Sequence, residues 1–292
     1  MFIDAHAHAV RTPLPAVPGI PPLPTAEQLV AYYDRIGVEQ GVLLPLTGPE
    51  VNLPQCNEDI LEMAARHPGR FIPFCNLHPR ALDNSSGAPL AELMRYYRQL
   101  GCKGIGEVTC NLPISDPYIQ NFFAQAEQAG LPMTVHLAHR LDRVYGLYDQ
   151  PGLPQLAAAL ERFPGLRILG HSQPFWAEIS RLENADDRAG YPAGKVVEGV
   201  VPRLLRRFGN LYGDLSAGSG GNALMRDPEY AVTFIHEFQD RLLFGIDLCR
   251  PTGPEPPPLA AFLTGLRDAG KISAAIFDKL ARRNVINLLG LA

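Results

Sequence analysis

The chain of 292 residues is 46% hydrophobic and 19% charged, which supplies a full globular core and excludes global disorder. Its 26 basic and 30 acidic residues give a net charge of −4 without a block of Lys or Arg, so no nucleic-acid partner is expected. No long uncharged apolar stretch occurs, and we expect neither a membrane span nor a signal peptide.

Short apolar or β-branched runs alternate with amphipathic segments along the chain. The predicted strands are Met1–His8, Gln40–Leu46, Arg70–Leu77, Gly101–Val108, Pro132–Leu137, Leu166–His171, Asn210–Leu215 and Arg241–Leu248. The predicted helices are Ala26–Ile36, Ile60–His67, Leu90–Leu100, Ile119–Ala129, Leu153–Phe163, Val196–Phe208 and, as a last outer helix, Ile272–Leu289. Strands that alternate with helices form parallel sheets, and eight of them match a closed barrel better than an open sheet. We therefore predict an α/β fold, one (β/α)₈ TIM-barrel domain over residues 1–292.

Long irregular segments follow predicted strands, whereas the connections that lead into strands are short. The long segments are Ala9–Thr25, Ser172–Lys195, Ala217–Asp227 and Cys249–Pro258. In a barrel, the loops after strands gather on the face that carries active sites. The sequence therefore places a candidate functional site at that face.

The cysteines indicate a reducing compartment. Five are present, an odd number without a CxxC pair: Cys56, Cys75, Cys102, Cys110 and Cys249. Several lie in apolar, strand-like runs, where a free Cys behaves as a small buried hydrophobe. We therefore predict no disulfide framework. We expect a soluble, cytoplasmic protein.

The first predicted strand contains the sequence Asp4-Ala5-His6-Ala7-His8. Because strand side chains alternate, His6 and His8 are predicted to project to one face together with Asp4. Two imidazoles side by side make half of a metal site. A pair of this kind alone is more often two hydrogen-bonded core histidines, so further ligands are needed to support the prediction.

Further polar side chains stand near the C-terminal ends of apolar predicted strands: Glu107, His136, His171 and Asp247. Burial inside the barrel would be costly for them, so we expect them to point to its mouth. Imidazoles and carboxylates together suit a divalent transition metal. The combination therefore predicts a metal site.

Two positions have alternatives. Lys103 shares the strand parity of Glu107 but lies deeper, and a salt bridge at the barrel rim is the alternative role for Glu107. His139 could replace His136, yet it falls past the predicted strand end. Glu107 and His136 are the favoured ligands.

The chain resembles the amidohydrolase superfamily, specifically its amidohydrolase-related branch, also called amidohydrolase 2. The resemblance covers nearly the whole chain and rests on seven segments in order: DAHAH, GIGE, TVHLAH, ILGHSQ, LYGDLSA, LFGIDL and the closing RNVINLLG. It implies a distorted (β/α)₈ barrel with one or two divalent metals, zinc being expected and manganese the alternative.

The metal ligands that the resemblance implies are His6, His8, Glu107, His136, His171 and Asp247. The first two histidines and the aspartate would bind one metal, the glutamate would bridge, and the last two histidines would bind the second metal. In relatives with one metal, the strand-five histidine joins the first metal and the strand-six histidine contacts substrate or water.

The expected reaction is hydrolysis of an amide, lactone or ester bond. The metal would polarise the carbonyl and lower the pKa of its bound water, while Asp247 would transfer the proton and His171 would help to stabilise the oxyanion. Asp4 or Asp214 would orient the ligating imidazoles. The alternatives are a decarboxylase or hydratase of an aromatic or unsaturated acid, and a barrel that binds metal without turnover. A bridging Glu107 favours hydrolysis.

Loop residues on the same face are candidates for substrate binding: His78, His139, Arg140, Trp176 and Arg250. Arginines beside aromatic rings suit a planar or carboxylated substrate, although each residue alone is more often ordinary surface charge or loop packing. The expected partner is a small-molecule substrate, without nucleic acid or membrane, and homodimer formation is left open.

Overall fold

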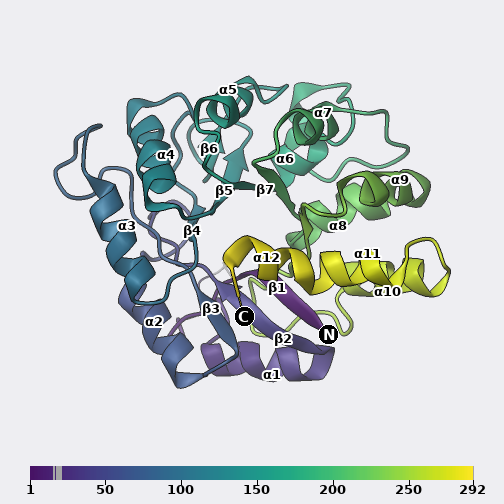
Figure 1. Cartoon of the computed structure of the whole chain (residues 1–292), viewed down its shortest axis with the longest axis horizontal. Coiled ribbons are helices and arrows are strands. Elements are labelled where there is room, and N and C mark those ends of the chain that lie inside the picture. Colours follow the sequence, from purple (N-terminus) through teal and green to yellow (C-terminus); the bar gives the residue numbers. More distant parts are fainter. Residues whose placement is uncertain (16, 18–21, 292) are drawn as a thin grey trace.

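The computed structural model describes residues 1–15, 17 and 22–291. Parallel strands form the centre, and the helices up to residue 278 follow one another around the outside in chain order (Figure 1). The strands are β1 (Phe2–Ala7), β2 (Val38–Leu43), β3 (Phe71–Pro73), β4 (Ile105–Val108), β5 (Met133–Ala138), β6 (Leu147–Tyr148), β7 (Ile168–His171), β8 (Leu211–Asp214) and β9 (Leu242–Leu243). Each predicted strand has a counterpart, and the short β6 is an addition.

The strands form two parallel ladders that together complete a ring. One ladder has the order β1-β2-β3, and the other has the order β4-β5-β7-β8-β9, with β6 paired to β5. Backbone hydrogen bonds connect the ladders on both sides: Cys75 N donates to Gly104 O (3.0 Å), and Ala5 N donates to Phe244 O (2.9 Å). The predicted barrel is therefore confirmed.

The helices are α1 (Ala26–Ile36), α2 (Asn57–Arg66), α3 (Leu90–Gln99), α4 (Pro117–Ala129), α5 (Pro154–Arg162), α6 (Gln173–Ala177), α7 (Val200–Arg207), α8 (Ala217–Met225), α9 (Pro228–Phe238), α10 (Pro258–Asp268), α11 (Ala274–Asp278) and α12 (Asn284–Leu289). Local sequence explains their ends. In α1, the Thr25 hydroxyl accepts from Gln28 N, the Gln28 side chain accepts from Thr25 N, and Gly37 ends the helix in the left-handed conformation. None of the described helices has the length and apolar character needed to cross a membrane.

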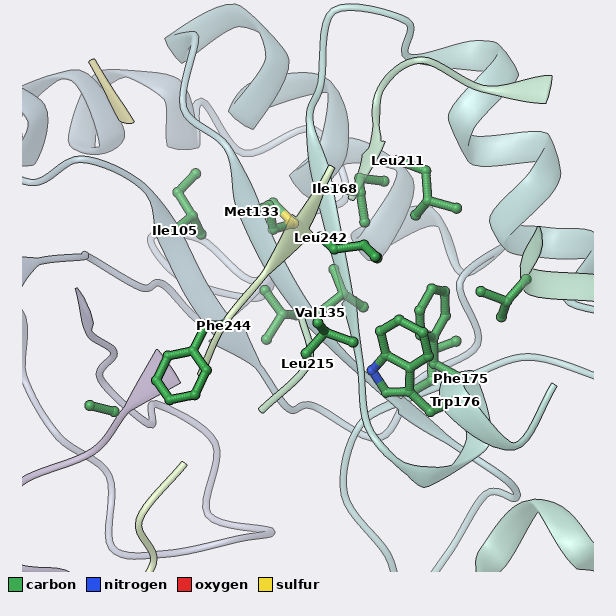
Figure 2. Packing of buried hydrophobic residues seen from close by; sticks show 14 of the residues in the cluster. Ile105, Met133, Val135, Ile168, Phe175, Trp176, Leu211, Leu215, Leu242 and Phe244 are labelled. Carbon is green, nitrogen blue, oxygen red and sulfur yellow. The ribbon is translucent and has the colours of Figure 1, made fainter. Parts of the chain in front are cut away.

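Apolar side chains fill the layer between the strands and the outer helices. Figure 2 shows part of this layer, in which Met133 of β5, Ile168 of β7 and Leu242 of β9 belong to one cluster with Phe175 and Trp176. Burial of such side chains stabilises the fold by about 1.5–3 kcal/mol each.

The five cysteines all lie in the described part of the chain and are free.

A second apolar cluster fills the interior of the barrel. Ala5, Phe74 and Leu169 come from strands across the ring, and Leu288 of α12 belongs to the same cluster. The Leu288 carbonyl also accepts from Arg167, which precedes β7. The predicted helical segment Ile272–Leu289 is present as α11, a π-helical turn at Lys279–Arg283 and α12. Its last part closes the N-terminal end of the barrel instead of packing as an outer helix.

Residues 217–227, for which the sequence predicts an irregular segment, begin with helix α8. Glycines lower the helix propensity of this segment, but Gly220 is needed because a Cβ there would overlap the backbone of Leu215. The close packing of α8 against Leu215 therefore outweighs the low helix propensity of its glycines. Residues 16 and 18–21 of the predicted loop Ala9–Thr25 lie outside the described residues.

Candidate metal centre

His6 and His8 stand at the C-terminal end of β1 with their Nε2 atoms 3.0 Å apart. The other nitrogen of each ring is held: His6 Nδ1 lies 2.6 Å from Asp214 Oδ2, and His8 Nδ1 lies 2.9 Å from the Leu44 carbonyl oxygen. Carboxylate and carbonyl oxygens accept hydrogen bonds, so each Nδ1 carries a proton and Nε2 is the nitrogen of each ring that can bind a metal. At this distance the two Nε2 atoms can share a proton or face a common cation. The pair therefore has the donor arrangement of a metal site.

Asp247 lies beside this pair of histidines and completes a group of side chains that could hold a metal ion. Its Oδ1 lies 3.9 Å from His6 Nε2 and 3.7 Å from His8 Nε2, and the three ligand atoms all lie within 4.8 Å of one another. Asp247 N donates to the His6 carbonyl oxygen (2.9 Å), which ties the segment after β9 to β1. The carboxylate is 12% exposed, so it reaches the cavity above the ligands.

Glu107 lies between two pairs of histidines. Its Oε2 lies 3.4 Å from His8 Nε2 and 3.7 Å from His6 Nε2, whereas its Oε1 lies 2.7 Å from His136 Nδ1 and 3.7 Å from His171 Nε2. Although burial favours the neutral acid, His136 and His6 hold the pKa of Glu107 well below its ordinary value. The residue is therefore an anion that faces both pairs, as a shared ligand would.

The backbone before Glu107 depends on a glycine. Gly106 has a φ of 132°, and a Cβ at this position would lie 2.8 Å from the carbonyl oxygen of Thr134 on β5. A side chain is therefore excluded by both conformation and space. This close approach of β4 to β5 brings Glu107 against His136.

His171 and His136 occupy the other half of the centre. His171 Nδ1 lies 3.0 Å from Ser216 Oγ and 3.3 Å from an oxygen of Asp214, so it carries the proton and leaves a lone pair at Nε2. His6, Glu107 and His171 form a second group whose ligand atoms lie within 4.8 Å of one another. His136 contacts Glu107 but belongs to neither group within the described residues, and its ring packs against Tyr145.

Asp214 orients a histidine in each half of the centre, as predicted. Although burial favours its neutral form, His6 and His171 hold the pKa of Asp214 well below its ordinary value. Its second oxygen, Oδ1, accepts from Ser216 N (2.9 Å). The carboxylate therefore determines which nitrogen of each ring is free for a metal.

Asp214→Asn is expected to weaken metal binding by about 10–100-fold. Asparagine keeps an oxygen for Ser216 N, but its amide group would face the two imidazoles and disfavour the tautomer with a free Nε2. Competition with a chromogenic chelator measures the affinity. The control is Asp240→Asn, in an exposed salt bridge with Lys279. An unchanged affinity in Asp214→Asn would show that the rings are oriented by other contacts.

Asp4 does not share the face of His6 and His8, contrary to the prediction. Its Oδ2 accepts from the Tyr33 hydroxyl of α1, and its Oδ1 accepts from the backbone of His6 and Ile246. The register of β1 against β2 shifts between Asp4 and Ala7, which breaks the simple alternation of side chains. Burial raises the pKa of Asp4 to about 7, against the opposing hydrogen bonds. Asp4 therefore orders the backbone that carries His6, not the imidazoles.

A cavity of about 350 Å³ opens at this centre. Its described lining is His8, Leu23, Leu46, Val51, Asn52, Glu107, His136, Tyr145, Asp247 and Cys249. Asn52 and the three aliphatic residues come from loops after β1 and β2 and were not among the predicted site residues. Isolated aliphatic residues in the segments after the first two strands were the available signal.

Among the described residues, the lining does not include any of the predicted substrate contacts: His78, His139, Arg140, Trp176 and Arg250. Trp176 is 1% exposed and donates from Nε1 to the Asp214 carbonyl oxygen, so it supports the site from within the core. Arg140 and Arg250 are exposed. His78 Nδ1 accepts from Arg80 N, and His139 is partly exposed. Within the described residues, these side chains are therefore not part of the cavity wall.

The family model described as amidohydrolase matches residues 3–291, so the chain belongs to the amidohydrolase family. A search of curated proteins gave no match. The match to the family model confirms the resemblance inferred from the sequence.

Solved structures share the fold. An uncharacterised TIM-barrel protein from Bordetella bronchiseptica is 19% identical, with a TM-score of 0.62 and coverage of 99% of this chain and 98% of that one. A probable 2-pyrone-4,6-dicarboxylic acid hydrolase from Acinetobacter baumannii is 15% identical, with a TM-score of 0.61 and 99% coverage of both chains. A 5-carboxyvanillate decarboxylase from Sphingomonas paucimobilis is 17% identical, with a TM-score of 0.60 and coverage of 100% and 99%. At these identities the likeness concerns the fold alone.

Proposed function

We propose that the protein is a metal-dependent hydrolase that cleaves an amide, lactone or ester bond. The observation that carries the proposal is the position of Glu107, with one oxygen toward His6 and His8 and the other toward His136 and His171. A buried carboxylate in this position would suit two neighbouring cations, because its negative charge would screen their repulsion.

The donor set fits divalent metals. His6, His8 and Asp247 would hold one ion, and Glu107 and His171 would hold a second together with His136. Neutral imidazoles with carboxylates favour zinc, and manganese is the alternative. When bound, such a metal supplies a Lewis acid for the carbonyl and lowers the pKa of water.

Asp247 is proposed as the proton-transfer group. It accepts a proton from the attacking water, whose oxygen forms the new bond to the carbonyl carbon. It then returns the proton to the leaving nitrogen or oxygen as the C–N or C–O bond breaks. Its partly exposed carboxylate in the cavity lining supports this role.

Tyr145 is a better candidate than His171 for a hydrogen bond to the oxyanion. The Nε2 of His171 offers a lone pair, which suits a metal ligand but not a donor. Tyr145 lines the cavity, and burial together with Glu107 and Asp247 raises the pKa of its phenol. The hydroxyl is therefore protonated at neutral pH and able to donate.

Decarboxylation or hydration of an aromatic or unsaturated carboxylic acid is the second candidate. It is favoured by His6, which belongs to both groups of converging ligands, so that a single ion beside His6 would be within reach of both groups. With a single metal, Glu107 would be free to contact the substrate.

The proposed function is tested on protein stripped with a chelator and reloaded with zinc or manganese. Lactones, aryl esters and anilides are assayed for release of acid, and aromatic acids are assayed for release of carbon dioxide. Metal-dependent hydrolysis without carbon dioxide release is the expected result. Carbon dioxide release without hydrolysis would establish the second candidate in its place.

A further inference from the structure

We infer that the cavity takes a small substrate that is uncharged and apolar outside the bond that reacts, an inference that rests on the proposed function of the metal centre. The sequence favours a carboxylated substrate, because arginines follow the fifth and eighth predicted strands. The described cavity lining argues against it.

One wall of the cavity is a separate hydrophobic cluster. Leu23 and Leu46 pack with Val10, and Val51 packs against them. Leu23, Leu46 and Val51 also line the cavity beside the ligands His8 and Glu107. A ligand placed against the centre therefore contacts aliphatic side chains. Burial of apolar surface in this contact favours binding of an apolar ligand.

Hydrogen bonds hold this wall in place. Gln55 donates from its side chain to the Ala9 carbonyl oxygen (2.8 Å), and its side-chain oxygen accepts from Leu46 N (3.1 Å). Val10 N donates to the Pro24 carbonyl oxygen (2.9 Å). The loops after β1 and β2 are thus connected, and the wall is built before any ligand arrives.

The described lining contains Glu107 and Asp247 but no Lys or Arg. The residues outside the described part are Ala16, residues 18–21 (PGIP) and Ala292, which include no charged side chain either. A substrate carboxylate directed to the aliphatic wall would lose water without gaining a cation, which weakens its binding. Asn52 and Tyr145 offer hydrogen bonds to a neutral polar group.

The volume adds a limit on size. About 350 Å³ lies near the lower end of the range for small-molecule sites. A compact aryl or alkyl ester, lactone or amide meets both conditions. A substrate with several carboxylates meets neither.

The test compares two probes that differ by one carboxylate. Benzohydroxamic acid and 4-carboxybenzohydroxamic acid, which share the same metal-binding group, are titrated calorimetrically into the zinc-loaded protein. Phenyl acetate and 4-acetoxybenzoate are assayed for hydrolysis in parallel. The neutral hydroxamate is expected to bind at least about tenfold more tightly, and the neutral ester to show a higher kcat/KM by a similar factor.

A charged variant strengthens the test. Val51→Lys places an ammonium group in the wall and is expected to shift the ratio of the two hydroxamate affinities about tenfold toward the carboxylated probe. Leu53→Lys adds the same charge to the same loop at a side chain that is 64% exposed and outside the described lining, and should leave the ratio unchanged.

The outcomes separate the two proposals. Equal or tighter binding of the carboxylated hydroxamate by the unmodified protein would overturn the inference on substrate class, while hydrolysis of either ester would still support the proposed function. Selective binding of the neutral hydroxamate without hydrolysis of the esters would support the inference on the ligand and contradict hydrolysis of esters at this centre.

Discussion

Asp247→Asn is expected to lower kcat of the metal-loaded protein by about 10²–10⁴-fold while the fold is retained. The amide has the shape of the carboxylate and can still accept from the Cys249 thiol, which lies 3.3 Å from Oδ1. The backbone bond from residue 247 to the His6 carbonyl oxygen is also unaffected. The amide cannot, however, accept the proton from water. Steady-state kinetics at saturating substrate, with metal content measured on the same sample, gives the result.

The matched control is Asp142→Asn, on the loop after β5, where the side chain is 84% exposed. This variant should keep full activity, because the carboxylate lies outside the described cavity lining. Near-normal turnover in Asp247→Asn, with normal metal content, would assign proton transfer to another group.

Glu107→Gln is expected to reduce the metal content from about two ions per chain to about one. A neutral amide cannot balance two cations, and it replaces a buried anion whose pKa is held low by His136 and His6 despite burial. The ion at His6 and His8 should remain. Elemental analysis after loading with excess zinc or manganese and removal of free metal measures the content.

Glu92→Gln serves as the control, because Glu92 is exposed and pairs with Arg95 on α3. It should bind as much metal as the unmodified protein. One ion per chain in both the unmodified protein and Glu107→Gln would exclude a bridging role. Decarboxylation would then become as well supported as hydrolysis, and release of carbon dioxide from aromatic acids would be the next measurement.

The strands and the convergence of the candidate ligands could be predicted from the sequence for one physical reason. The C-terminal ends of parallel strands in a barrel meet at one face, so polar residues that end apolar runs must approach each other. Glu107, His171 and Asp247 come together for this reason although they lie far apart in the chain. Strand alternation also gave the correct pairing of His6 with His8.

The loops and irregularities could not be predicted because they depend on contacts distant in sequence. Asp4 turns to Tyr33 on α1 at a shift in strand register that no local pattern announces. The cavity wall depends on Gln55, which connects the segment after β2 to Ala9. Trp176 appeared exposed to ligand in a long loop, but it lies in a short helix against β8. Propensity and periodicity carry no information on such contacts.

The support of the histidines has a consequence for redesign. Asp214 orients His6 and His171 at once, so a change that retunes one half of the centre for another metal will disturb the other half. His8 is different, because its ring rests on the main-chain carbonyl of Leu44, which no side-chain substitution removes. Attempts to alter the metal preference of the proposed centre should therefore begin at position 8, where a new ligand can be introduced without loss of the support shared by its neighbours.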